Sequence, residues 1–329
     1  MNQPAEPLPF WPEGKRFAFT VFDDTDLGTR ENLREVYAML DDFGFRTSKS
    51  CWVIQGDPAR GKLPGETLEN KDYRQWILEL RNKGFEIGWH GATWHCCERS
   101  EVAAALDRFA EVFGHYPATG TNHTGASESI YWGDARLTGW RVYLYNLLTR
   151  LKNRRKYRGH VEGDRYFWGD ICKQRIKYYR NFVYRDINTL RACPAMPYHD
   201  PLKPFVNYWF SASDGHDLDT FNRCIGEANQ DRLEEEGGAC IMYTHFAKGF
   251  SDSNGVNRRF EELMRRLADK DGWFVPVGVL LDRLLAVRGR HRQRVGALRA
   301  AHPVADRLSE FVQALSGAGR DQQRPSVLL

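Results

Sequence analysis

The sequence lacks several features that would mark a membrane, secreted or nucleic-acid-binding protein. It has no run of roughly 18 to 20 apolar residues, and its first residues show no basic start followed by an apolar stretch. Its seven cysteines are odd in number and none is spaced as CxxC, the usual signature of a structural zinc site or a redox motif. Lys and Arg exceed Asp and Glu by only four. We therefore expect a cytoplasmic protein with free thiols and no nucleic-acid partner.

What the sequence does contain is enough apolar residues for one large core, since 42% of its 329 residues are hydrophobic. Short apolar runs alternate with segments of helical periodicity in the first third, which is typical of βα units around a parallel sheet. Strands are predicted at 17–22, 47–54, 85–89, 205–211, 239–244 and 273–277. Helices are predicted after the capping residues Thr29, Asn70 and Ser100, and around 260–267.

These elements predict an α/β fold with one main domain at 1–286, and a C-terminal helical extension and tail at 287–329. Between about 137 and 190 lies an insertion in which basic residues greatly outnumber acidic ones and aromatic residues are interleaved. Its simplest interpretation is a solvated helical pair that covers one side of the barrel. It would also suit peripheral contact with a membrane, or the diphosphate of a carrier-linked sugar. Single-stranded nucleic acid ranks last, because no nucleic-acid motif accompanies the charge.

Acidic residues follow the first predicted strand in the segment FTVFDDTD. Asp23 and Asp24 are adjacent, and two neighbouring carboxylates are costly to bury without a cation. A metal would resolve that repulsion, because one carboxylate could bind it while the other acts as a base. Asp26 is better explained as an acidic residue near the start of the helix that Thr29 caps.

Histidines follow two other predicted strands. His90 lies at the end of one strand and His95 five residues later, which is a moderate signal for a metal site. His245 ends the strand ACIMYT and is a candidate general acid. Asn122 and His123 lie in a turn-rich loop, where a structural role and a substrate or metal contact are equally well supported.

Over about residues 16–285, these segments together resemble the polysaccharide deacetylases, the family-4 carbohydrate esterases. The resemblance implies a distorted (β/α) barrel of that type. The sequence Val21-Phe22-Asp23-Asp24 matches the family's first motif, which makes Asp23 the catalytic base and Asp24 a metal ligand. The apolar strand that ends at His245 matches the last motif, in which the histidine is the acid.

The second family motif has two metal-binding histidines separated by three residues, whereas four residues separate His90 from His95. His123 and Cys96 are therefore reserve ligands for the case that His95 misses the metal. For the third motif, Tyr116-Pro117 followed by Asn122-His123 is at most a divergent version. For the fourth, Asp214 is the candidate that orients His245, with Asp217 as a weaker choice.

The resemblance implies a hydrolase that uses a divalent metal, expected to be Zn²⁺, bound by Asp24, His90 and His95. The expected reaction is removal of an N-acyl group, in the first instance acetyl, from a sugar, with a nucleotide- or lipid-linked glycan precursor as a candidate substrate. Two alternatives remain open. One is a hydrolase of a small non-sugar amide or cyclic imide, and the other is a barrel that binds a glycan without catalysis.

Overall fold

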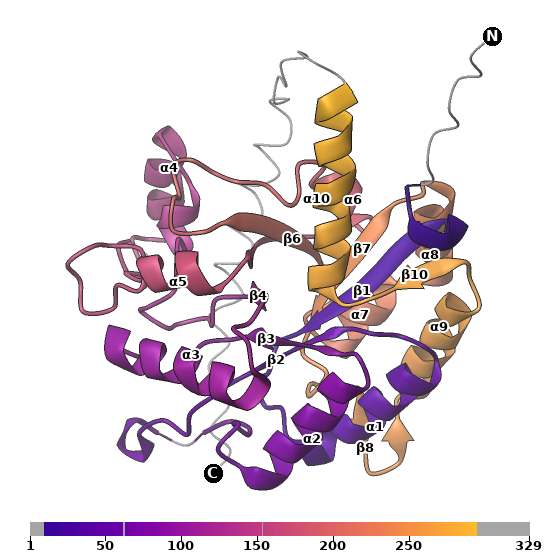
Figure 1. Cartoon of the computed structure of the whole chain (residues 1–329), viewed down its shortest axis with the longest axis horizontal. Coiled ribbons are helices and arrows are strands. Elements are labelled where there is room, and N and C mark those ends of the chain that lie inside the picture. The colour runs from indigo at the N-terminus through magenta and orange to yellow at the C-terminus, as the bar shows by residue number, and fades with distance from the viewer. Residues whose placement is uncertain (1–9, 62, 153, 295–329) are drawn as a thin grey trace.

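Seven parallel strands, β1 to β7, form a ring in the computed structural model of the chain, which describes residues 10–61, 63–152 and 154–294 (Figure 1). Each strand pairs with the next along the chain, and β7 pairs with β1 over six residue pairs, from Ala18 with Ala239 to Asp23 with Thr244. This last pairing closes the ring. The prediction of an α/β fold with a (β/α) barrel is thus confirmed.

The strands are β1 (Phe17–Asp23), β2 (Ser48–Cys51), β3 (Glu86–Trp89), β4 (Thr119–Gly120), β5 (Tyr178–Tyr184), β6 (Tyr208–Asp214), β7 (Ala239–Thr244), β8 (Ser251–Asp252), β9 (Gly255–Val256) and β10 (Gly272–Phe274). The helices are α1 (Arg30–Asp42), α2 (Lys71–Asn82), α3 (Arg99–Phe113), α4 (Trp140–Leu148), α5 (Gly169–Arg175), α6 (Thr189–Ala192), α7 (Leu218–Cys224), α8 (Glu227–Glu235), α9 (Arg258–Ala268) and α10 (Val277–Arg294). Three short 3₁₀ helices are η1 (Pro12–Gly14), η2 (Pro58–Arg60) and η3 (Gly133–Arg136).

Local sequence signals explain where several helices begin. Thr29 caps α1 through a capping box with Asn32, and the Asn70 side chain accepts hydrogen bonds from the first turn of α2. The expected cap at Ser100 is wrong, because α3 already begins at Arg99 and its N-cap residue is Glu98, in a capping box with Glu101.

The predicted insertion at 137–190 is not a helical pair alone. Its first part contains α4, but Tyr178–Tyr184 forms β5, which pairs in parallel with β4 and β6. The alternation of basic and aromatic residues there reflects a barrel strand rather than a solvated helix. One of its arginines, Arg180, consequently enters the barrel and is only 4% exposed.

The alternation of side chains along β1 separates the core into two layers. Phe17, Phe19 and Val21 face outward, where they pack against α1 and the other surrounding helices. Ala18 and Phe22 face inward and belong to a second cluster with residues of β5, β6 and β7. Neighbouring residues at the end of β1 are therefore expected to serve opposite sides of the strand.

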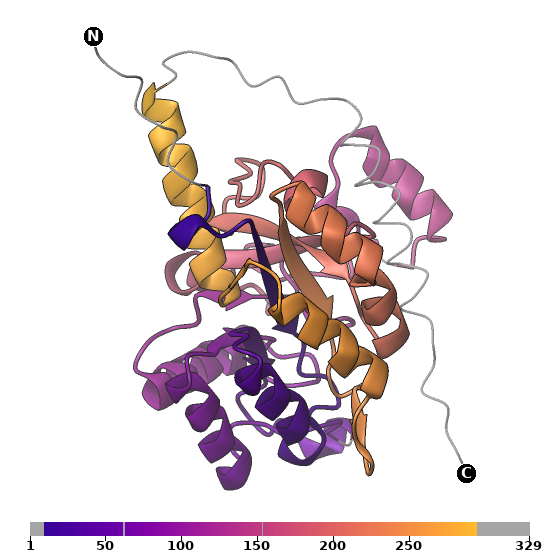
Figure 2. The same ribbon diagram turned by 90° about the vertical axis from the view of Figure 1, so that its right-hand side faces the viewer.

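Helix α10 contributes Leu280, Leu281 and Leu284 to the inner cluster and thus covers one end of the barrel. Its first turn binds side chains from the beginnings of β2 and β3, since Val277 N–H donates to Ser48 and Gly278 N–H donates to Glu86. The carboxyl ends of the strands lie at the opposite end. Figure 2 shows α10 (yellow-orange) extending beyond the sheet.

The predicted domain boundary at 286/287 falls within α10, which continues to Arg294. The rest of the predicted extension, 295–329, lies outside the described residues. Among the helices that the structure describes, none is long and apolar enough to span a membrane.

Candidate metal and catalytic site

The carboxyl ends of β1, β3, β4 and β7 bring together one carboxylate and three histidines. Asp26 follows β1, His90 follows β3, His123 follows β4 and His245 follows β7. Strand-end loops form the active sites of (β/α) barrels because parallel strands present their carboxyl ends on one face. Asp26 lies three residues beyond the end of β1, just before a turn at Leu27, whose φ is +65°.

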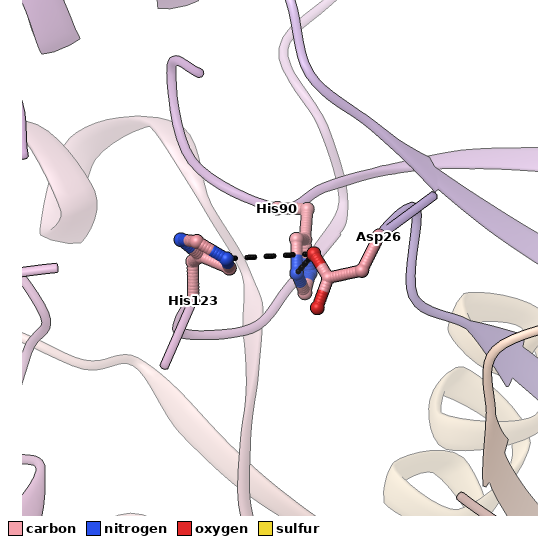
Figure 3. A group of neighbouring side chains, drawn as sticks. All are labelled: Asp26, His90 and His123. Carbon is pink, nitrogen blue, oxygen red and sulfur yellow. Dashed lines mark ion pairs between the residues drawn. The ribbon is translucent and has the colours of Figure 1, made fainter. Parts of the chain in front are cut away.

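One carboxylate oxygen of Asp26 faces two of these histidines (Figure 3). Its Oδ1 is 3.2 Å from His90 Nε2 and 3.5 Å from His123 Nε2. One ligand atom from each of the three residues lies within 4.8 Å of the others. Two imidazole nitrogens and a carboxylate oxygen form a donor set that zinc and related divalent metals accept.

The polar atoms of this group are buried without adequate hydrogen bonds. Asp26 Oδ1 and both ring nitrogens of His90 have no hydrogen-bond partner among the residues that the structure describes, although all three atoms are buried. Buried polar atoms are normally paired, so their convergence here needs an explanation. A bound cation would satisfy Asp26 Oδ1 and His90 Nε2 together, so the residues fit a metal.

The protonation states also suit a metal site. Burial lowers the pKa of His123 to about 4, although the negative charge of Asp26 opposes that shift. His123 is therefore neutral near pH 7 and has a lone pair to offer. Burial would raise the pKa of Asp26, but the charge of His90 and the contact with His245 hold it well below its usual range.

His245 lies at the edge of the group as the sequence predicts. Its Nε2 is 3.3 Å from Asp26 Oδ2, and its Nδ1 is 3.0 Å from the main-chain oxygen of His216. Because a carbonyl oxygen can only accept, Nδ1 is the donor in this contact. The contact with His216 uses Nδ1 only, so Nε2 points toward Asp26.

Asp24 enters the barrel but binds an arginine. The guanidinium of Arg180 donates to Oδ1 of Asp24 at 2.8 Å and to Oδ2 at 2.6 Å. Both side chains are 4% exposed, and the guanidinium lies 4.3 Å from the ring centroid of Tyr243. Burial would raise the pKa of Asp24, but the charges of Arg180 and His90 and the hydrogen bonds from Arg180 together outweigh it, and the pKa is lowered. Asp24 Oδ1 is 3.8 Å from His90 Nδ1, so it adjoins the metal-binding group.

Asp23 faces the other side of β1. Its Oδ2 accepts from the Tyr37 hydroxyl at 2.9 Å and lies 3.3 Å from Lys49 Nζ, while its Oδ1 accepts from Phe246 N–H at 2.9 Å. Both carboxylate oxygens of Asp23 therefore already have partners, on the side of β1 that faces the helices. The structure thus keeps Asp23 away from the histidines, whereas Asp24 lies beside His90 and Asp26 contacts both His90 and His123.

His95 does not join the histidine group. Its Nε2 accepts from Asp57 N–H at 2.8 Å and its Nδ1 lies 2.9 Å from the main-chain oxygen of Cys96, so the ring stabilises the loop that carries η2. The reserve candidate Cys96 is also elsewhere, since its sulfur accepts from Ser127 N–H. His123, the other reserve, takes the place expected for His95.

Asn122 and Asp214 have supporting contacts. Asn122 donates to the Ile130 carbonyl and accepts from Ile130 N–H, which closes the loop that carries His123. Asp214 pairs with Nδ1 of His216 at 3.0 Å. Asp214 therefore holds His216, whose main-chain oxygen in turn accepts from His245 Nδ1. Asp217 binds the other ring nitrogen of His216 and caps α7.

Sequence reasoning missed Arg180 and Trp52. Trp52 is fully buried, and its ring centroid is 5.6 Å from that of His123 and 6.2 Å from that of His90. An arginine within the apolar run YYRNFVY was a usable signal for Arg180, because a charge inside a buried strand requires a partner. No comparable signal marked Trp52.

No protein-family model matches the chain, and no curated protein sequence matches it. Its fold resembles that of solved deacetylases. A polysaccharide deacetylase from Mycobacterium smegmatis matches with a TM-score of 0.48 and 12% identity, over 92% of this chain and 99% of that one. A probable polysaccharide deacetylase from Pseudomonas aeruginosa PAO1 matches with a TM-score of 0.46 and 13% identity, over 91% and 97%. An allantoinase matches with a TM-score of 0.45 and 13% identity, over 89% and 95%.

The buried pair of Asp23 and Lys49 yields a stability prediction. Both side chains are at most 1% exposed, so Lys49→Met leaves the Asp23 charge with fewer partners and should cost about 3–5 kcal/mol of unfolding free energy. The double variant Asp23→Asn/Lys49→Met should be destabilised by less than the sum of its single variants. The free energy of unfolding in urea should be measured for the wild type, the two single variants and the double variant. Additive effects would show that the two charges do not depend on one another.

A second buried carboxyl lies in the loop that carries His123. Glu128 is 5% exposed, its Oε2 has no hydrogen-bond partner within the described structure, and it borders a cavity of about 10 Å³. Burial raises the pKa of Glu128 to about 7, although hydrogen bonds from its own N–H and that of Cys97 oppose the shift.

The raised pKa predicts a pH-dependent stability. The folded protein retains the Glu128 proton above the ordinary value of 4.5, so stability should fall as pH rises from about 4.5 to 7 and change little beyond. The effect should be about 3 kcal/mol. Glu128→Gln should remove this part of the slope in urea unfolding at pH 5 and pH 8. The exposed control Glu162→Gln should keep the wild-type slope; equal slopes in all three proteins would contradict the assignment.

Proposed function

We propose that this chain is a divalent-metal-dependent hydrolase that removes an N-acyl group from an amino sugar. The observation that carries the proposal is the convergence of Asp26 Oδ1 and His90 Nε2, both buried without hydrogen-bond partners in the described structure, on a site that also includes His123. An acid–base pair adjoins that site. Asp24 lies beside His90, and His245 lies beside Asp26.

Asp26, His90 and His123 are the proposed ligands. A divalent ion held there, with zinc as our first choice, would supply polarisation of the acyl carbonyl and a bound water of lowered pKa. The neutral state of His123 and the ionised state of Asp26 are those that metal binding requires.

Asp24 is the proposed base. Arg180 keeps its carboxylate ionised and fixes the plane of the carboxyl group through two hydrogen bonds. Asp24 accepts a proton from the attacking water as the water oxygen forms a bond to the acyl carbon.

His245 is the proposed acid. In its protonated form it holds Nδ1 against the His216 carbonyl, and its Nε2 delivers a proton to the amine nitrogen as the carbon–nitrogen bond breaks. The products are a carboxylate and a free amine. His216 and Asp214 contribute by positioning this ring rather than by touching the substrate.

The amino-sugar substrate rests on the motif resemblance around Asp24 and His245. A sugar linked to a nucleotide or lipid carrier would suit the basic residues after β4, because such carriers are anionic.

The ligand set can be tested by elemental analysis of purified protein. We expect about one divalent metal per chain, and loss of that metal in Asp26→Ala and in His123→Ala. His95→Ala is the matched control, because this imidazole binds the η2 loop instead, and it should retain the metal. Loss of metal in His95→Ala with retention in His123→Ala would overturn the proposed set. So would a wild-type protein that binds no zinc, cobalt or nickel.

The acid–base pair can be tested by measuring acetate release from N-acetylated sugars, free and nucleotide-linked. Asp24→Asn and His245→Ala should each lower kcat by about 10²–10⁴-fold while the metal content stays unchanged. A cyclic ureide and simple N-acetyl amides should be included as substrates. Turnover of these alone would overturn the sugar assignment, and saturable glycan binding without any turnover would overturn the hydrolase.

A further inference from the structure

We propose that α4 and the turns that follow it form a docking surface for an anionic lipid bilayer. This docking surface, defined as residues 140–152 and 154–156, lies between β4 and β5. It is located at the periphery of the molecule, away from the barrel wall (Figure 1). The proposal concerns where the protein works and is independent of the hydrolase chemistry.

The first observation is a concentration of exposed apolar side chains. The described part of the chain has ten large hydrophobic residues that are exposed, and five of them lie on the docking surface. Such clusters are unusual on proteins that bind nothing there. The five exposed hydrophobic residues on the docking surface are Trp140 (65% exposed), Tyr143 (79%), Leu147 (72%), Leu148 (55%) and Leu151 (55%).

The spacing of these residues gives α4 one apolar face toward the outside. Trp140, Tyr143 and Leu147 recur at intervals of three and four residues, which places them on one side of a helix. The opposite side holds the helix in place, since Tyr145 packs with Leu137 in a small separate cluster. These internal contacts fix the orientation of α4, so its apolar face stays turned outward.

The second observation is the charge of the surrounding residues. From Ala135 to Val161 the chain has no Asp or Glu, whereas it has eight Lys or Arg residues. Five of these, Arg150, Lys152, Arg154, Arg155 and Lys156, are exposed in the turns directly after α4. Trp, Tyr and Leu flanked by basic residues form the composition that inserts at the interface of an anionic bilayer. A protein partner or a second copy of this chain would not require such one-sided charge.

The docking surface is also connected to the end of the barrel that carries the site. Arg136, at the end of η3 just before α4, donates to the Asn181 carbonyl at 2.7 Å. Asn181 follows Arg180, which binds Asp24. The segment emerges from the loop after β4, which also carries His123. Docking would therefore hold the site's face of the barrel close to the membrane.

Vesicle co-sedimentation of the full-length chain tests this proposal. The wild type should bind vesicles of equal parts phosphatidylcholine and phosphatidylglycerol, bind pure phosphatidylcholine far more weakly, and lose binding as salt increases. The double variants Tyr143→Ser/Leu147→Ser and Arg154→Glu/Arg155→Glu should each reduce partitioning to anionic vesicles at least about tenfold. Their metal content should remain that of the wild type, which controls for folding.

Matched controls come from exposed residues elsewhere. Leu202→Ser removes a side chain that is 70% exposed, and Arg258→Glu reverses a charge on a side chain that is 92% exposed. Both should bind vesicles as the wild type does. The proposal is overturned if the wild type binds no vesicles, or if the controls reduce binding as much as the docking-surface variants do. It is also overturned if the same residues bind single-stranded oligonucleotides in place of vesicles, or hold two copies of the chain together in sedimentation.

Discussion

The closure of the barrel between β1 and β7 is the constraint on which the site depends. Six residue pairs join these strands, and Asp24 N–H extends the pairing by donating to the Thr244 carbonyl at 2.8 Å. This bond fixes Asp24 beside the residue that precedes His245. The base proposed on the first strand and the acid proposed on the seventh are thus neighbours, although 220 residues separate them in the sequence.

Two buried ion pairs then determine what each carboxylate at the end of β1 can do. Lys49 and Tyr37 bind Asp23 on the helix side of the strand, while Arg180 binds Asp24 on the barrel side. Each charge is compensated within its own layer, which is what burial of ionised groups requires. Asp26 differs because its Oδ1 faces only imidazoles, whose nitrogens can share a cation but do not here donate to it.

Much of the site could be predicted from the sequence, because polar residues directly after apolar strands are visible as a pattern. His90, His245 and the acidic segment after β1 were found in this way. The separation of Asp23 and Asp24 into two layers was also predictable, since adjacent residues of a strand face opposite sides. The choice between His95 and His123 was different in kind. It depended on whether the loop after β3 or the loop after β4 turned its imidazole toward Asp26, and no periodicity describes such loops.

The sequence by itself determined the βα alternation, the strand ends that carry polar residues and the basic, aromatic character of the segment after β4. These properties depend on the spacing of residues along the chain. Only the tertiary structure decided that Arg180 lies on a barrel strand, that His95 binds its own loop, and that Asp26 contacts both His90 and His123 while Asp24 binds Arg180. Those outcomes depend on which charged and hydrogen-bonding side chains meet across strands that are far apart in the sequence. Only the three-dimensional arrangement determines which charges and lone pairs find a partner.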